Sequence, residues 1–213
     1  MSKRIAIFGV SGFAREVADI CYDLNYDDIV FLDEVKPADS ATVNGFAILP
    51  ESDVDALHEK GFEFAIGIGD PTIKKKIAAR YSALHFPNLI HPSVTFGVNQ
   101  RAAVEQSKGN IFTAGVRLTN SIYVGDFNTF NLNVTIGHDS KLMGFVTLSP
   151  GANVSGNVVV HEGAYIGTNA SILQGGNDNP IEVGEYAIVG AGSFVRKSVD
   201  PKTTVVGVPA KPR

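Results

Sequence analysis

The stretch NTFNLNVTIGHDSKLMGFVTLSPGANV, at residues 128–154, places a bulky apolar residue at every sixth position. The same spacing holds at eleven successive positions between residues 112 and 172. Because 44% of the chain is hydrophobic, such a run has a chance probability on the order of one in ten thousand for one register, which marks a true repeat. A period of six fits neither an α-helix nor a single strand. It predicts a parallel β-helix of hexapeptides, in which short strands form the flat faces of a prism.

Smaller residues form a second column four positions after the bulky ones, and glycine often follows the bulky residue directly. These glycines are Gly125, Gly137, Gly167, Gly184 and Gly190. We expect the bulky residues to point into the prism, the small ones to pack at its corners, and the glycines to occupy turns that need a positive φ. The register breaks at residues 176–180 and then resumes. This segment is either a loop over a ligand or a tolerated insertion.

The first 88 residues have a different composition. They hold nine basic and fourteen acidic residues, against nine and eight in the remainder, and only six of the 22 glycines. Apolar runs at residues 5–8, 29–32 and 64–68 alternate with helical patterns at 13–24, 52–60 and 72–81. This alternation predicts a small Rossmann-like parallel sheet. We therefore expect an α/β domain at residues 1–88 and an all-β domain at residues 89–213.

Composition and charge argue against several classes of protein. A net charge of -4 gives no general surface for nucleic acid, and the basic run at residues 74–76 is interpreted as a solvated helix face. There is no run of about 18 apolar residues, so a membrane span is not expected. The single cysteine, Cys21, is assigned to the core, and no Cys/His cluster has zinc spacing, so no metal is expected. These features favour a cytoplasmic protein.

Six motifs carry a resemblance to a known family. They are Phe8-Gly-Val-Ser-Gly-Phe-Ala14, Phe31-Leu-Asp-Glu34, Ile66-Gly-Ile-Gly-Asp70, Leu89-Ile-His-Pro-Ser93, Ile136-Gly-His-Asp139 and Val206-Gly-Val-Pro-Ala-Lys211. The hexapeptide run and the last motif resemble the left-handed β-helix acyltransferases. Together the motifs resemble the PglD/NeuD-type sugar acetyltransferases, over essentially the whole chain, and among these the enzymes that act on nucleotide-linked 4-amino-4,6-dideoxy sugars. The resemblance implies a left-handed β-helix, acetyl-CoA as donor and a homotrimer with active sites between neighbouring prisms.

His138 is the main candidate for chemistry. It occupies the third slot of the repeat that begins at Ile136, so its side chain should project outward near a corner of the prism. An imidazole can take a proton near neutral pH from an amine or hydroxyl that attacks a thioester, and Asp139 can orient the ring. The alternative is a surface histidine beside a turn aspartate, which the position in the repeat disfavours. The resemblance implies that His138 is the general base and Asp139 its acidic partner, where PglD-like enzymes of the bacillosamine pathway can have Glu.

The other four histidines have no comparable context. His91, in Ile-His-Pro-Ser, is expected to be structural. His161 occupies a slot usually held by a small residue and should face solvent. His58 and His85 lie in the leading domain without an evident partner.

Gly156 follows His138 by eighteen residues, or three hexapeptides, so the two should stack in neighbouring turns of the β-helix. Its amide can then face a developing oxyanion, unless it is only a turn glycine. The resemblance places Thr147, Gly156 and Thr168 at coenzyme-contact positions, with Ala191 a looser match. Thr147 stands where a relative has His.

A nucleotide site is predicted at the carboxyl edge of the parallel sheet. The turn Gly9-Val-Ser-Gly-Phe-Ala14 offers backbone amides and a helix N-terminus to a phosphate. Asp33 and Glu34 end the second strand and Gly69 the third, at the edge where open sheets bind ligands. Each feature alone indicates a turn, but together they favour a nucleotide; the glycine spacing is not that of an NAD site. The resemblance assigns the nucleotide-sugar to Ser11, Gly12, Phe13, Asp33, Glu34 and Gly69, and places Asn131 near the reacting sugar.

The sequence thus predicts an acetyl-CoA-dependent N-acetyltransferase that acts on the 4-amino group of a UDP-linked 4-amino-4,6-dideoxy-N-acetylhexosamine. Other enzyme hypotheses are O-acetylation of a sialic or other sugar, and N-acetylation of a GDP- or dTDP-linked amino sugar. A binding or scaffolding protein is a hypothesis of another class, and a nicotinamide oxidoreductase is a distant third.

Overall fold

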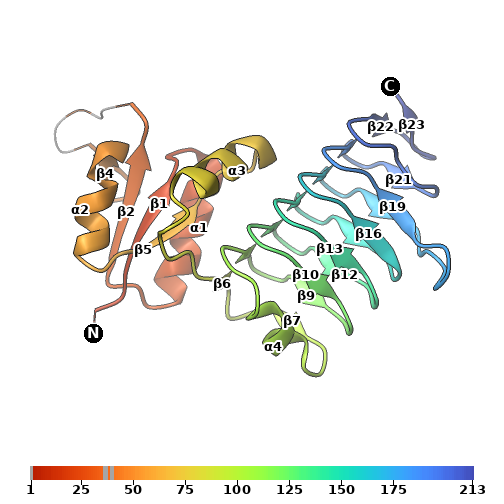
Figure 1. The fold of residues 1–213 in the computed structure, drawn as a ribbon, viewed down its shortest axis with the longest axis horizontal. Helices are drawn as coiled ribbons and strands as arrows, with labels where there is room; N and C mark the ends of the chain where they lie inside the picture. The colour runs from red at the N-terminus through yellow and green to blue at the C-terminus, as the bar shows by residue number, and fades with distance from the viewer. Residues whose placement is uncertain (1, 36–37, 39–40) are drawn as a thin grey trace.

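The computed structural model describes residues 2–35, 38 and 41–213. Its two parts follow one another along the chain (Figure 1): a sheet flanked by helices, then a stack of triangular coils. The coils begin with β6 (Leu89–Ile90). The predicted fold class, an α/β part followed by a parallel β-helix, is confirmed.

The N-terminal sheet has the strand order β3-β4-β2-β1-β5. Its strands are β1 (Arg4–Phe8), β2 (Asp28–Asp33), β3 (Thr42–Val43), β4 (Phe46–Pro50) and β5 (Glu63–Ile66). All pair in parallel except β3, which runs antiparallel to β4. The sequence predicts β1, β2 and β5 but not the other two. A short apolar run such as that of β4 is compatible with strand or helix, and its pairing with β2 decides between them.

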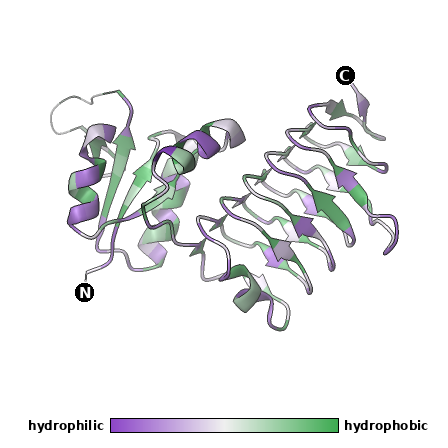
Figure 2. Ribbon diagram, viewed as in Figure 1, coloured by the Kyte–Doolittle hydropathy of each residue, from purple (hydrophilic) through white to green (hydrophobic). Residues whose placement is uncertain are grey.

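Helices cover both faces of this sheet. They are α1 (Gly12–Asp23), α2 (Val54–Glu59), which continues a 3-10 turn (Glu51–Asp53), and α3 (Pro71–Arg80). α1 packs one apolar side against Ile5 and Ile7 of β1, and the fully buried Cys21 belongs to this cluster, as predicted. Figure 2 shows the apolar strands between the more polar outer sides of the helices. No helix in the described part of the chain is long and apolar enough to span a membrane.

The β-helix has three faces. Face 1 consists of β6, β8 (Ile111–Phe112), β11 (Thr129–Phe130), β14 (Thr147–Leu148), β17 (Tyr165–Ile166), β20 (Ile188–Val189), β22 (Thr204–Val206) and the antiparallel β23 (Lys211–Pro212). Face 2 consists of β7 (Thr95–Phe96), β9 (Arg117–Leu118), β12 (Thr135–Ile136), β15 (Asn153–Val154), β18 (Ser171–Ile172) and β21 (Phe194–Val195). Face 3 consists of β10 (Tyr123–Val124), β13 (Lys141–Leu142), β16 (Val158–Val160) and β19 (Ile181–Val183). A short helix, α4 (Gln100–Val104), lies between β7 and β8.

Residues eighteen apart stack in successive coils, as Thr129 on Thr147 does. The bulky column points inward and is buried, which confirms the prediction from the hexapeptide period. Within it the rings of Phe112 and Phe130 stack 4.3 Å apart at 7°. Identical side-chain positions in successive coils therefore build one continuous apolar core.

The glycines that directly follow bulky residues were predicted to supply a positive φ, and this prediction was wrong. Gly137 and the four glycines grouped with it do not have a positive φ. A Cβ at Gly137 would lie 2.5 Å from the nitrogen of Gly156 in the next coil, so glycine is needed there because the backbones approach closely. Positive φ occurs instead at other turn residues, among them Asn133 (φ 58°), Asp139 (φ 59°) and Phe145 (φ 61°).

The two parts are joined through α3, which Figure 1 shows between the sheet and the coils. Lys74 is 2% exposed, and its Nζ donates hydrogen bonds to Thr129 Oγ1 (3.1 Å), the carbonyl of Val146 (3.2 Å) and Thr147 Oγ1 (2.9 Å). The Thr147 hydroxyl in turn donates to the carbonyl of Gly69 at 2.7 Å. α3 is thus bound to two adjacent coils through one side chain.

The basic run at residues 74–76 is not the solvated face predicted from its charge. Lys74 is buried, Lys75 forms an ion pair with Glu162 of the β-helix, and only Lys76 is left exposed without an ion-pair partner among the described residues. Three successive positions on a helix point in different directions. The seam between the two parts therefore decides the environment of each lysine.

We predict a pH-dependent contribution of Lys74 to stability. Burial lowers the pKa of Lys74 from 10.5 to about 7, and Asp70 offsets part of the shift. The unfolded state binds the proton of Lys74 more tightly than the folded state. The free energy of unfolding should therefore rise with pH between about 7 and 10.5, by at most about 1.4 kcal/mol per pH unit from this group. Urea denaturation at several pH values should show a steeper rise for the native chain than for Lys74→Met. Parallel curves would contradict the prediction.

Candidate active site

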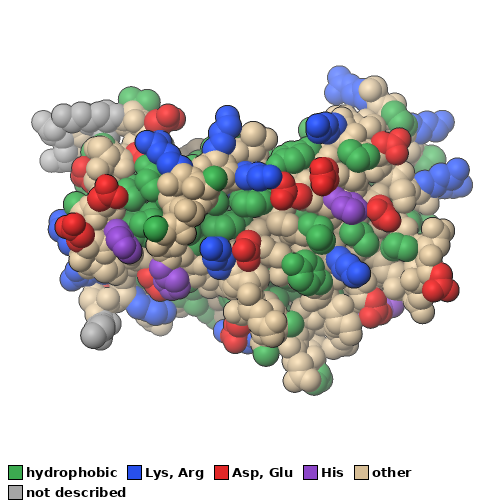
Figure 3. Space-filling model, in the orientation of Figure 1, with side chains coloured by type: hydrophobic (Ala, Val, Ile, Leu, Met, Phe, Trp, Pro, Cys, Tyr) green, Lys and Arg blue, Asp and Glu red, His purple; other side chains and the backbone are tan. Residues whose placement is uncertain are grey.

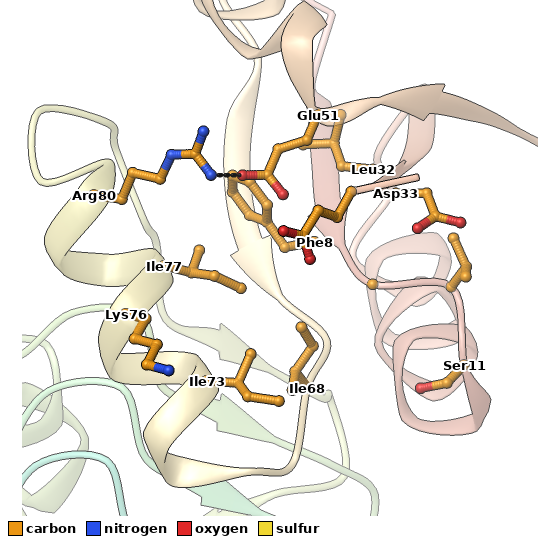
Figure 4. A pocket seen from close by; sticks show the side chains of 13 residues that line it. Phe8, Ser11, Leu32, Asp33, Glu51, Ile68, Ile73, Lys76, Ile77 and Arg80 are labelled. Carbon is orange, nitrogen blue, oxygen red and sulfur yellow. Dashed lines mark hydrogen bonds and ion pairs between the residues drawn. The ribbon is translucent and has the colours of Figure 1, made fainter. Parts of the chain in front are cut away.

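A cleft of about 610 Å³ opens at the carboxyl ends of β1 and β2 (Figure 4). The chain order reverses at β1, because β2 and β4 lie on one side of it and β5 on the other. Open parallel sheets bind ligands at such a switch point. Gly9, Ser11, Asp33 and Glu34, all in motifs singled out from the sequence, line this cleft.

The turn after β1 is built for close approach of a ligand to the backbone. Gly9 has φ 101°, and a Cβ there would lie 3.0 Å from Ile68 Cγ1, so glycine is required. Ser11 precedes α1, but its side chain does not cap the helix. The N–H groups of the first turn are therefore left for a ligand, and they favour an anion such as phosphate.

Basic residues on α3 complete the cleft, and the sequence reading missed them. Lys76 and Arg80 line the cleft together with Ile73 and Ile77, and Figure 4 shows all four on the side that faces Ser11. In the space-filling view basic side chains gather over α3 (Figure 3). The signal was available, because residues three and four apart share one face of a helix.

Glu51 organises one end of the cleft. Its Oε1 accepts hydrogen bonds from Arg80 Nη1 at 2.8 Å and from the hydroxyl of Tyr81 at 2.7 Å. Burial and the contact with Glu51 raise the pKa of Tyr81 to about 12, so the phenol stays a donor at neutral pH. Lys76 is left as the cation for an anionic ligand, while Asp33 offers acceptors for hydroxyl groups.

Four predicted substrate residues do not line the cleft. Gly12 begins α1, Phe13 is half-buried against the α1 cluster, and the carbonyl of Gly69 accepts the hydrogen bond from Thr147. Asn131 lies at the seam near Glu16 of α1, where its side chain offsets part of the rise in the pKa of the Glu16 carboxyl that burial causes. Their roles in substrate binding stay predictions.

His138 projects from the corner between face 2 and face 3, as its slot in the repeat predicts. Its side chain is 50% exposed, and its Nδ1 lies 2.7 Å from Oδ2 of Asp139. With Nδ1–H donating to that carboxylate, Nε2 is left as the acceptor for a substrate proton. The left-handed backbone of Asp139 is one that Asp tolerates, and the short side chain reaches the ring.

Gly156 lies directly against the His138 ring. A Cβ at Gly156 would be 2.7 Å from both Cε1 and Nε2 of the imidazole, so any other residue would displace the ring. The Gly156 N–H has no acceptor among the backbone hydrogen bonds of the described residues. The predicted stacking of these residues is therefore present, with an amide available beside the base.

A paired carboxylate does not by itself distinguish His138 from the other histidines. His161 lies 2.9 Å from Glu182, and His91 contacts Asp23 and Ser93. The expectation that His85 has no partner was wrong, since its Nδ1 lies 3.2 Å from Oε1 of Glu63. What distinguishes His138 is its position over a glycine amide at an open corner.

The predicted coenzyme-contact residues lie in three separate places. Gly156 lies beside His138. Thr168 and Ala191 lie at the corner between face 1 and face 2, one coil apart. Thr147 is on face 1, buried beneath α3, and its hydroxyl is engaged with Lys74 and Gly69. A coenzyme role for Thr147 stays a prediction, and it would require this contact to open.

Within one chain the prism separates the cleft from His138. The N-terminal part contacts face 1 through Lys74, the corner with face 3 through the ring of Phe86 against that of Phe127 at 5.2 Å, and the corner with face 2 through Asp23 against His91 at 3.0 Å. His138 lies on the corner opposite face 1. The segment at residues 176–180 leaves the same corner as His138, because Gly175 N donates to the carbonyl of Gly156 at 3.0 Å.

No group of three or more His, Cys, Asp or Glu side chains within residues 2–35, 38 and 41–213 is arranged to hold a metal ion. The polar groups that line the cleft can bind an organic anion, and those beside His138 can transfer a proton.

Comparisons with known proteins identify the family to which the chain belongs. Residues 4–81 match the family described as the PglD N-terminal domain. A GDP-perosamine N-acetyltransferase from Escherichia coli O157:H7 is 31% identical, over 96% of this chain and 94% of its own. The acetyltransferase domain of PglB from Neisseria gonorrhoeae FA1090, solved in complex with acetyl coenzyme A, has a TM-score of 0.87 at 28% identity and covers 100% of both chains.

PerB from Caulobacter crescentus, solved in complex with CoA and GDP-perosamine, has a TM-score of 0.84 at 25% identity and covers 99% of this chain and 97% of its own. The similarity to these proteins thus extends over both the cleft-bearing part and the β-helix. The chain belongs to the sugar acetyltransferases of the hexapeptide-repeat superfamily that carry a PglD-type N-terminal domain.

Proposed function

We propose that the protein transfers the acetyl group of acetyl-CoA to the 4-amino group of a UDP-linked 4-amino-4,6-dideoxy-N-acetylhexosamine in bacterial glycan biosynthesis. The observation that carries the proposal is the combination, in one chain, of a carboxylate-paired histidine over a glycine amide and a cleft with nucleotide-binding chemistry. The relatives solved with acetyl coenzyme A, or with CoA and GDP-perosamine, support the donor and the class of acceptor.

The cleft would hold the nucleotide part of the acceptor. Its diphosphate would face the first turn of α1 and the ammonium of Lys76, and its ribose hydroxyls would donate to Asp33. The sugar would then extend along α1 toward Asn131 at the seam. The resemblance also assigns Ser11, Gly12, Phe13, Glu34 and Gly69 to this ligand.

His138 would act as the general base. The acceptor nitrogen attacks the thioester carbonyl carbon, Nε2 of His138 takes the proton that the nitrogen loses, and the Gly156 amide stabilises the tetrahedral oxyanion. Collapse of this intermediate breaks the C–S bond, and the proton passes to the departing thiolate of coenzyme A. Asp139 keeps the imidazole in the reactive tautomer and stabilises the imidazolium. The reaction needs no covalent acyl-enzyme.

The working enzyme would be a homotrimer whose sites combine two copies. In one chain the cleft lies over face 1 and His138 on the opposite corner, so a neighbour must supply His138 to each cleft. The predicted donor residues are divided in the same way, with Gly156 at one corner and Thr168 and Ala191 at another. Placing the corner between faces 2 and 3 of one copy against the corner between faces 1 and 2 of the next would bring them together.

A second candidate acceptor is a GDP-linked 4-amino sugar. It is favoured by the relative named GDP-perosamine N-acetyltransferase, which is similar over nearly the whole chain. The residues near the cleft offer carboxylates and backbone groups that suit either uracil or guanine.

Calorimetric titration of UDP, GDP and dTDP should give the tightest binding for UDP, because our proposal assigns the cleft to a uridine nucleotide. Lys76→Glu should weaken binding of all three at least tenfold, since it places a carboxylate beside the diphosphate. A preference for GDP or dTDP would replace UDP in the proposal. Binding without acetyl transfer to any amino or hydroxyl sugar would favour a binding protein.

His138→Ala should lower kcat at least a hundredfold without lowering the unfolding temperature, because the side chain is half-exposed and makes no core contact. His161→Ala is the matched control, since His161 is also paired with a carboxylate on the β-helix, and it should keep the native rate. Acetyl-CoA consumption with product mass gives the readout and separates N- from O-acetylation. A native rate in His138→Ala would remove His138 from the mechanism.

At an acceptor concentration too low to saturate Lys76→Glu, co-expression of His138→Ala with Lys76→Glu should give more activity than either variant has alone. In a mixed trimer a cleft from the first variant meets a histidine from the second, so about one site in three is intact by the closed threefold symmetry. Light scattering should give the mass of three chains. If mixed assemblies stay inactive, each site is contained in one chain.

A further inference from the structure

Lys74 is a buried titratable group that the proposed reaction does not use. It lies on α3, the helix that also brings Ile73, Lys76, Ile77 and Arg80 to the nucleotide cleft. The same short helix therefore forms one wall of the cleft and the contact with the β-helix. A displacement of α3 would move the cleft relative to the coils.

The contacts of Lys74 connect α3 to two coils at once. Its Nζ lies between Thr129 and Thr147, which are paired in adjacent strands of face 1, and also donates to the carbonyl of Val146. The Thr147 hydroxyl, which accepts from Lys74, donates to the carbonyl of Gly69 just before α3. The hydrogen bonds thus bind both the start and the first turn of α3 to the prism.

These bonds are directional, and an apolar contact is not. Burial of an amine is costly, which agrees with the lowered pKa of Lys74. Among the residues that the structure describes, the charged group that acts on Lys74 is Asp70, whose carboxylate caps α3 by accepting from the N–H groups of Thr72 and Ile73. A methionine at position 74 would fill the same space but would form no hydrogen bonds to the β-helix. The amine therefore fixes the position of α3 on the β-helix, which apolar burial alone would not.

We propose that Lys74 is a positioning residue, which holds the nucleotide cleft at a fixed place on the β-helix so that the acceptor meets the acetyl donor. The inference rests on the proposed function, because the donor and the base lie on the β-helix. A small displacement of a bound acceptor from its reactive geometry costs a large factor in rate. Binding of the nucleotide alone needs only the cleft.

Lys74→Met should therefore lower kcat at least tenfold at saturating acceptor and acetyl-CoA, with dissociation constants for UDP and for CoA within twofold of the native values. Lys75→Met is the matched control on the same helix. Its partner Glu162 is across the same seam, but both side chains are substantially exposed, and such pairs contribute little. Its kcat should stay within twofold of the native value.

Thr147→Val tests the same contact from the β-helix side without changing the volume much. It should lower kcat like Lys74→Met, and the double variant should be no worse than either single one, because both changes remove one set of hydrogen bonds. CoA affinity should not change. A loss of CoA affinity in Thr147→Val alone would assign Thr147 to coenzyme binding and would contradict a positioning role for its hydrogen bond with Lys74.

Hydrogen–deuterium exchange gives a readout that does not depend on activity. Amides at residues 71–80 should exchange faster in Lys74→Met than in the native chain or in Lys75→Met, while the β-helix keeps its protection. If the native protein transfers no acetyl group, the proposed function fails, and exchange still reports whether Lys74 fixes α3. If the native protein is active and Lys74→Met keeps its kcat, or loses nucleotide affinity in proportion, the positioning role is wrong.

Discussion

Parallel hydrogen bonding between backbone segments eighteen residues apart holds the β-helix together, and the other features depend on it. It brings Gly137 N to 2.7 Å from the carbonyl of Val154 and Asn157 N to 2.9 Å from that of His138. At this spacing some positions tolerate no Cβ. The same close approach that demands glycine places the His138 ring against the Gly156 amide, so packing and chemistry have one cause.

The triangular prism also keeps groups on different sides of it apart. A helix docked on one face is separated from the opposite corner by the whole apolar core, and the core is close-packed. α3 on face 1 and His138 on the far corner are therefore both well positioned, yet unable to act on one ligand in one chain. This separation gives a chemical reason for the predicted trimer, because a neighbouring copy could bring its His138 to the cleft.

The N-terminal part contributes a cleft of a kind that parallel sheets commonly form, and its side chains give that cleft its particular chemistry. The switch point at β1 and the open first turn of α1 follow from the sheet order and suit many phosphate ligands. Lys76, Asp33 and the Glu51–Arg80 pair line the cleft, and their charges and acceptors suit the anionic, hydroxyl-bearing ligand that we propose. Joining such a cleft to an acetyltransferase scaffold matches the nucleotide-linked acceptor named for the relatives of this chain.

The sequence by itself determined the β-helix, the parallel sheet and the outward slot of His138, because each follows from a local period or from a turn. It also placed Gly9 and Asp33 at the ligand edge, since strand ends can be read from apolar runs. Only the tertiary structure decided the environment of Lys74. That environment depends on where α3 meets residues some seventy positions further along the chain, and no local pattern encodes that contact.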